Sequence, residues 1–222
     1  MTKQSATPET KRQTEKDARA WQRMLSGRRL DLLNPSPLDI EIDDIAHGIA
    51  RVARWNGQTI GEHSFSVAQH CLVVEETAAA IDPQIPARWR LAALLHDAAE
   101  YVVGDMISPF KAAISGDYKS IERRLDEAVH IRFGLPPALP PQVKALIKKA
   151  DKACAYFEAV QLAGFSRADA RKHIGAPPPD IDITLEPMAA KDAQSAYLRR
   201  FYELSEIVDK VHPPLQGARP WK

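Results

Sequence analysis

The stretch ALLHDAAEYVVGDMISPFK, residues 93–111, decides the fold. Apolar Ala, Leu and Val dominate its first half, yet it also carries His96, Asp97, Glu100 and Asp105. Charged groups on an apolar helix face are costly unless they are paired, hydrogen-bonded or bound to a metal. The stretch therefore predicts partners for these side chains elsewhere in the chain.

Composition indicates one globular domain without a strong electric field. The chain has 222 residues, of which 45% are hydrophobic and 27% charged. Its 30 Lys and Arg against 29 Asp and Glu give a formal charge of +1, so we expect neither a nucleic acid polymer nor a membrane as partner. Residues 1–16 are polar and predict a flexible tail, which leaves 17–222 as a single domain.

Two observations predict a soluble, cytoplasmic protein. The N-terminal residues lack the apolar segment of a signal peptide, and nowhere do about 18 apolar residues run together as a membrane span requires. Cys71 and Cys154 are the only cysteines, and their apolar neighbours indicate buried, unpaired thiols.

Apolar residues recur at helical spacing through most of the chain, which predicts an all-α bundle. Between the helices, residues 30–43 contain prolines and an alternating apolar pattern, so they allow a short, marginal two-stranded excursion. The expected helices span residues 17–27, 43–54, 63–81, 87–103, 117–134 and 143–164, with a last long helix from about 187.

His96 and Asp97 are candidate metal ligands. On a helix, adjacent side chains diverge by about 100° and can hold one ion between them. Further ligands must come from other helices, and two candidates are His63, at the expected helix start in GEHSFSVAQH, and Asp151, at the margin of a buried stripe. Imidazole with carboxylate suits one divalent Mn, Fe, Co, Ni or Zn ion better than Mg or Ca.

The order of these residues resembles the H…HD…D signature of the HD-domain superfamily of metal-dependent phosphohydrolases. The pattern HDAAEYVVGDMISPFK, with Arg54 and Trp55 upstream, is similar to the bacterial 5′-deoxynucleotidase branch of that superfamily. The resemblance covers roughly residues 43–165 and implies that the helical bundle is of the HD-domain type. It implies that His63, His96, Asp97 and Asp151 are the metal ligands.

The resemblance also implies roles for other residues. Glu100 and Asp105 match the acidic residues that handle the water and the leaving oxygen. Arg54 would offer a planar fork to the phosphate, Trp55 a flat wall to the sugar or base, and Lys111 a further positive charge. Alternatively, Arg54 and Trp55 close the end of a helix.

Alternatives remain for several of these residues. His70 lies seven residues after His63 on nearly the same helical face, so it is a rival ligand or lines the pocket. A buried role beside the ligands is favoured, because the signature already supplies four. Asp151 could instead pair with Lys148 or Lys152, and the His96–Asp97 pair could belong to a satisfied polar network.

The expected activity is the release of phosphate from a small phosphomonoester, above all a nucleoside 5′-monophosphate. A phosphodiester or pyrophosphoester nucleotide is the rival substrate. A module that binds metal and nucleotide without hydrolysis is the rival function. A chain with so many amphipathic helices can leave apolar helix faces without a partner, and such faces are compatible with a homodimer.

Overall fold

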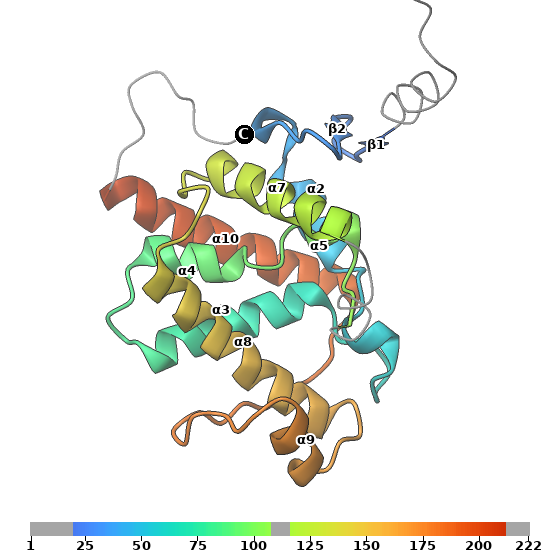
Figure 1. The fold of residues 1–222 in the computed structure, drawn as a ribbon, viewed down its shortest axis with the longest axis vertical. Coiled ribbons are helices and arrows are strands. Elements are labelled where there is room, and N and C mark those ends of the chain that lie inside the picture. The colour runs from blue at the N-terminus through green and yellow to red at the C-terminus, as the bar shows by residue number, and fades with distance from the viewer. Residues whose placement is uncertain (1–19, 108–115, 212–222) are drawn as a thin grey trace, which may run out of the picture.

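The computed structural model describes residues 20–107 and 116–211, without the side chains of residues 116 and 117. Within these ranges the fold is mostly helical with one two-stranded sheet, as predicted (Figure 1). No helix there is both long and apolar enough to cross a membrane. The predicted tail and Lys111 lie outside the described residues. The helices are α2 (Ile42–Ile49), α3 (Val67–Ile81), α4 (Ala87–Leu94), α5 (Glu100–Val103), α7 (Gly116–Arg132), α8 (Pro141–Gln161), α9 (Arg167–His173) and α10 (Ala190–Val211), with 3-10 turns η1 (Pro37–Asp39) and η2 (Arg54–Gly57).

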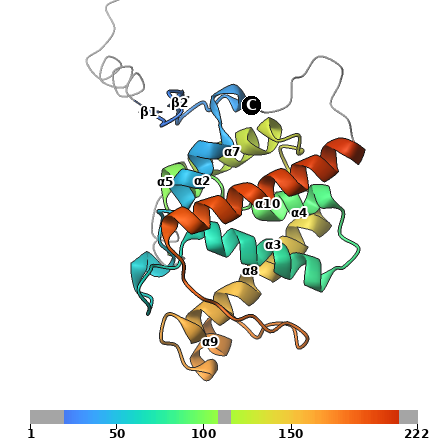
Figure 2. The same ribbon diagram turned by 180° about the vertical axis from the view of Figure 1, so that it is seen from behind.

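Four helices form the main core. α3 contacts α4, α8 and α10, and α10 also lies against α4 (Figure 2). Tyr197 and Phe201 of α10 are completely buried in this core, one helical turn apart. The Tyr197 hydroxyl donates a hydrogen bond of 3.1 Å to the carbonyl of Leu94, at the end of α4. α10 therefore anchors the chain just before the His96–Asp97 pair.

The helix predicted over 87–103 is interrupted in the structure. α4 ends at Leu94 and α5 begins at Glu100, with turns between them. The Nδ1 atom of His96 lies 2.9 Å from the Ala93 carbonyl and must donate, since the carbonyl only accepts. In a continuous α-helix that carbonyl would accept the backbone N–H of Asp97. The histidine thus ends the helix and places His96 and Asp97 in the break.

The prediction of a helix over residues 17–27 is wrong. The structure has strand β1 (Trp21–Arg23) paired antiparallel with β2 (Arg29–Asp31), with Gln22 opposite Leu30. A two-stranded excursion therefore exists, but its first strand lies before the predicted stretch 30–43.

Contacts with α2 hold the β1–β2 turn in place. The Ser26 backbone N–H and hydroxyl donate to the carboxylate of Asp44 at 2.9 and 2.5 Å. Asp44 is buried and needs such donors. Gly27 permits the turn, because its φ of +91° lies in the left-handed region.

The structure starts α3 four residues later than predicted. Ser66 caps the helix, since its hydroxyl accepts the backbone N–H of Gln69. His63 therefore lies in the preceding loop, and His70 lies in the first turn of α3. This difference decides which histidine reaches the site described below.

Both cysteines are buried and unpaired, as the sequence predicts. Cys71 is on α3 and Cys154 on α8. Burial raises the pKa of Cys154 to about 12, so its thiol stays protonated at neutral pH.

Helices α2 and α5 approach each other closely at Gly48. A Cβ atom added there would lie 2.7 Å from the Cβ of Tyr101, a separation that real side chains do not adopt. α5 also carries Glu100, so this contact fixes the position of an acidic residue of the site.

We expect Gly48→Ala to lower the free energy of unfolding by about 1–3 kcal/mol, because it overpacks the α2–α5 contact. Alanine favours a helix over glycine by about 1 kcal/mol, so the predicted sign opposes intrinsic propensity. Urea unfolding measures the change. Glu76→Ala, on the exposed face of α3, is the control and should shift stability by less than about 0.5 kcal/mol. An unchanged or stabilised Gly48→Ala would contradict the close contact.

Candidate active site

Four polar side chains from three segments form a cluster of close contacts: ligand atoms of His70, His96 and Asp97 all lie within 4.8 Å of one another, and Asp151 joins them through His70. Asp97 Oδ2 lies 3.2 Å from His96 Nε2 and 3.5 Å from His70 Nε2. Asp151 Oδ1, from α8, lies 3.3 Å from the same His70 nitrogen. The histidines are almost fully buried, whereas the two carboxylates are partly exposed. The group therefore has a closed imidazole side and an open carboxylate side.

The other nitrogen of each imidazole is held by the protein. His96 Nδ1 donates to the Ala93 carbonyl, and His70 Nδ1 lies 2.5 Å from a carboxylate oxygen of Glu158. A proton on Nδ1 leaves a lone pair on Nε2 in the neutral ring. Both Nε2 atoms are buried and make no hydrogen bond within the described residues. Such anchoring through Nδ1 is typical of metal-binding histidines.

The spacing and chemistry of these groups fit a divalent transition metal. Ligand bonds of about 2.0–2.2 Å place neighbouring donors roughly 3.0–3.5 Å apart around one ion. The separations of 3.2, 3.3 and 3.5 Å lie in that range. Nitrogen and carboxylate donors together suit Mn, Fe, Co, Ni or Zn.

The electrostatics also favour a cation. Burial alone would raise the pKa of Asp97, but the charges of His96, His70 and Arg54 outweigh it and hold that pKa well below its usual range. Burial likewise opposes the charge of Asp151, and contact with His70 lowers its pKa. Both carboxylates therefore stay ionised, and a metal ion can supply the positive charge that protonated histidines supply without it.

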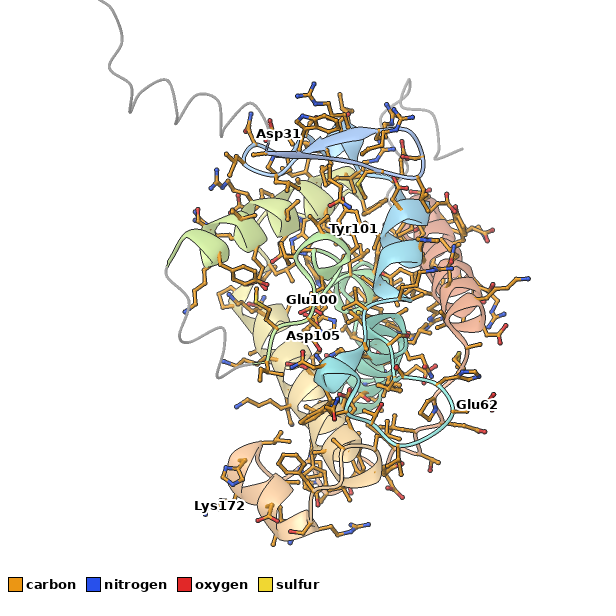
Figure 3. The ribbon with its side chains drawn as sticks, turned by 90° about the vertical axis from the view of Figure 1, so that its right-hand side faces the viewer. Asp31, Glu62, Glu100, Tyr101, Asp105 and Lys172 are labelled. Atoms are coloured by element: carbon orange, nitrogen blue, oxygen red, sulfur yellow. The ribbon has the colours of Figure 1, made fainter. Side chains whose placement is uncertain are left out.

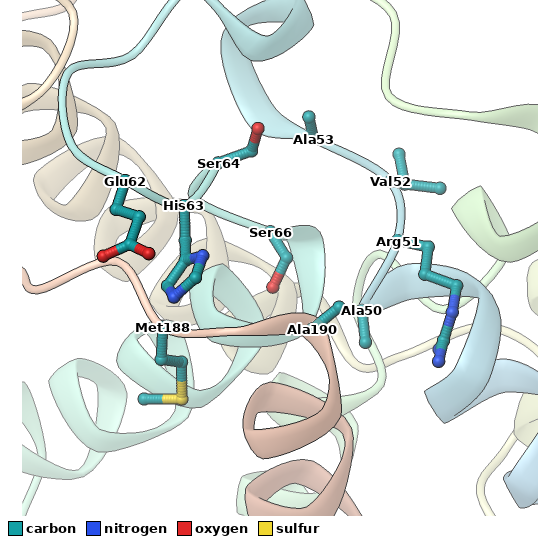
Figure 4. Close-up of a pocket in the computed structure, with 10 residues that line it drawn as sticks. All are labelled: Ala50, Arg51, Val52, Ala53, Glu62, His63, Ser64, Ser66, Met188 and Ala190. Carbon is teal, nitrogen blue, oxygen red and sulfur yellow. The ribbon is translucent and has the colours of Figure 1, made fainter.

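The structure does not bring His63 to this group. His63 lines a separate cavity of about 330 Å³ together with Glu62 and Met188 (Figure 4). This position does not favour the expectation that His63 completes the ligand set, because the loop before α3 places the His63 side chain away from the other ligands. His70, considered only as a rival, occupies the position.

The two carboxylates open onto a larger cavity of about 690 Å³. Glu100 and Asp105 line it, as expected of residues near the site. Figure 3 shows these two acids near the centre of the molecule and Glu62 on a loop at its edge. Besides these acids, the walls are formed by Arg54, Trp55, Met106, Ile107, Lys148, Lys152, Ala155, Phe165, His173 and Ile174.

Arg54 reaches the cavity but is largely held by the protein. Its Nε donates to Glu158 at 3.2 Å, and its Nη1 donates to Asp105 at 3.0 Å. Burial would lower the pKa of Arg54, yet these carboxylates raise it, so the charge is permanent. Only part of the guanidinium therefore remains to bind a phosphate, whereas the sequence predicts that the whole planar fork is available.

Trp55 forms an apolar wall of the cavity. Its ring centroid lies 5.7 Å from that of Phe165 at a tilt of 55°. Its indole Nε1 donates to Glu158 at 2.9 Å. Trp55 therefore does not close a helix end but presents an aromatic face to the cavity.

Several cavity residues were not singled out from the sequence as substrate contacts. The sequence offers Lys148 and Lys152 only as possible ion-pair partners of Asp151, yet both line the cavity beside it. The available signal was the position of Lys148, three residues before Asp151 and so beside it on the helix surface. Phe165, just before α9, and His173, at the end of α9, also line the cavity, and the apolar pattern did not reveal this helix.

Comparison with known proteins bears on the family of this chain. Residues 47–164 match the family of YfbR-like 5′-deoxynucleotidases. An uncharacterized protein of Rhodobacter capsulatus is 63% identical over 84% of this chain and 96% of its own length. YfdR of Escherichia coli is 28% identical over 76% and 86% of the two chains, and a 5′-deoxynucleotidase of Vibrio cholerae is 31% identical over 60% and 78%. The chain belongs to the YfbR-like 5′-deoxynucleotidase family, which is of the HD-domain type.

Proposed function

We propose that this protein is a metal-dependent phosphohydrolase that releases phosphate from deoxynucleoside 5′-monophosphates. One observation carries the proposal: two buried histidine nitrogens lie against two carboxylates, and these carboxylates share a cavity with two further acids and two lysines. The name of the Vibrio cholerae relative, a 5′-deoxynucleotidase, supports the substrate class.

We assign His70, His96, Asp97 and Asp151 as the metal ligands, so His70 replaces His63 in the expected set. When bound, a divalent transition ion supplies Lewis acidity toward the phosphate. The described residues supply the other functions of the site.

Glu100 and Asp105 are the groups available for proton transfer. Glu100 is 3% exposed and lines the cavity at the start of α5. Asp105 lines it just beyond Gly104 and accepts a hydrogen bond from Arg54. A carboxylate in such a position can take a proton from the attacking water, and a carboxylic acid can protonate the leaving oxygen. We assign these two steps to the pair of acids without dividing them.

The remaining walls suit a nucleotide. Lys148 and Lys152 bring positive charge to the rim near Asp151, where it can neutralise a phosphate. Trp55 and Phe165 offer aromatic surface on which a base can rest. A volume of about 690 Å³ lies within the roughly 300–1,000 Å³ usual for small-ligand sites.

We expect His70→Ala to weaken Mn²⁺ or Co²⁺ binding by on the order of 100-fold or more, since it removes a ligand. Titration calorimetry on the metal-stripped protein measures this. His63→Ala is the matched control, seven residues earlier, and should keep the affinity within about twofold. The opposite pattern would return His63 to the ligand set.

We expect Glu100→Gln to lower turnover by about 100- to 10,000-fold while metal binding persists, because it removes a proton-transfer group and no ligand. Asp97→Ala should lose both metal and turnover. Metal analysis and phosphate release on the same preparations separate the two effects. Glu100→Gln with normal turnover would remove Glu100 from the mechanism.

A substrate panel tests the function as a whole. The chelator-treated protein should be inactive, and added Mn²⁺ or Co²⁺ should restore phosphate release from deoxynucleoside 5′-monophosphates. Ribonucleotides, 3′-monophosphates, a phosphodiester and a pyrophosphoester complete the panel. Preference for either of the last two would establish the rival substrate class. Metal and nucleotide binding without any turnover would make the protein a non-hydrolytic binding module.

A further inference from the structure

Glu158 makes an unusual set of contacts beside the site. It lies on α8, seven residues after Asp151 and so on nearly the same helical face. Its side chain is completely buried, yet it lines none of the cavity wall described above. A buried carboxylate requires donors, and Glu158 receives three of them from two distant segments.

The two oxygens of Glu158 serve different parts of the site. Oε1 accepts from Nδ1 of His70 at 2.5 Å. Oε2 accepts from the indole Nε1 of Trp55 at 2.9 Å and from Nε of Arg54 at 3.2 Å. One carboxylate thus joins the imidazole at the metal site to the two neighbouring residues at the substrate cavity.

The backbone at Trp55 needs such support. Trp55 and Asn56 have φ values of +56° and +51°, in the left-handed region that side chains other than glycine rarely adopt. Residues in such conformations persist only when surrounding contacts determine them, and they are frequent at functional sites. The Trp55–Glu158 hydrogen bond is one of these contacts and keeps the indole turned inward.

We propose that Glu158 is a positioning residue that fixes both the His70 imidazole at the metal site and the Arg54–Trp55 turn at the substrate cavity. The inference deepens the proposed function and rests on it for the identity of the ligands. It predicts that losing the charge of Glu158 disturbs metal binding and substrate binding together, although Glu158 contacts neither.

Glu158→Gln is the test, since the amide keeps the size of the side chain but offers one acceptor oxygen in place of two. We expect Mn²⁺ affinity to fall by about 10- to 100-fold and the visible spectrum of bound Co²⁺ to change, because the His70 ring loses its fixed orientation. KM for the deoxynucleotide should rise in the same variant.

Glu75→Gln is the matched control. Glu75 is also completely buried and also pairs with arginines, Arg90 at 2.5 Å and Arg200 at 2.8 Å, but it lies outside the cavity. We expect it to lower stability while leaving Mn²⁺ affinity, the Co²⁺ spectrum and KM within about twofold of the unaltered protein. Equal losses in both variants would reduce the role of Glu158 to general stability.

A readout without metal or substrate separates this inference from the proposed function. The indole N–H resonance of Trp55, assigned through Trp55→Phe, should shift in Glu158→Gln and stay in place in Glu75→Gln. If the protein turns over no nucleotide, the proposed function fails while the resonance and the Mn²⁺ titration still decide the role of Glu158.

Unchanged resonance, metal affinity and KM in Glu158→Gln would overturn the inference. If that variant does not fold, Glu158→Asp decides, because its shorter carboxylate cannot reach both partners: a shifted Trp55 resonance together with weaker Mn²⁺ binding supports the link, and an unchanged resonance and Mn²⁺ affinity reject it.

Discussion

Buried ionisable groups need partners of opposite charge at fixed positions, and this requirement organises the molecule around its site. The core places two histidines, two aspartates and Glu158 in a chain of contacts, each between an imidazole and a carboxylate 2.5–3.5 Å apart. Each imidazole and its carboxylate partners stabilise one another only while the helices that carry them keep their positions. The charges and the helix packing therefore depend on each other.

The helix break at residues 95–99 has a physical cause and a chemical use. His96 binds the Ala93 carbonyl, which removes one backbone acceptor from the helix. The same bond leaves its Nε2 facing Asp97. One hydrogen bond thus both ends α4 and orients a side chain of the site, while the Tyr197 contact with Leu94 keeps the end of α4 in place.

The long helices were predictable because their apolar residues recur at helical spacing, and packing then buries that stripe. α8 and α10 are examples. The same rule failed at β1, where Trp21 and Met24 have helical spacing but the chain forms a hairpin tied to Asp44 through Ser26. It failed again at His96, because a side-chain hydrogen bond leaves no trace in the apolar period. Local pattern cannot report a contact made by residues far away in sequence.

The sequence by itself determined the helical class and the chemistry available: the His96–Asp97 pair, the acids after it and a distant Asp151. Only the tertiary structure decided which histidine joins them. His63 and His70 are seven residues apart and equivalent on an ideal helix, but the Ser66 cap starts α3 too late for His63 to share its face. The structure also showed that Glu158 contacts His70, since that contact spans 88 residues and depends on the packing of α3 against α8.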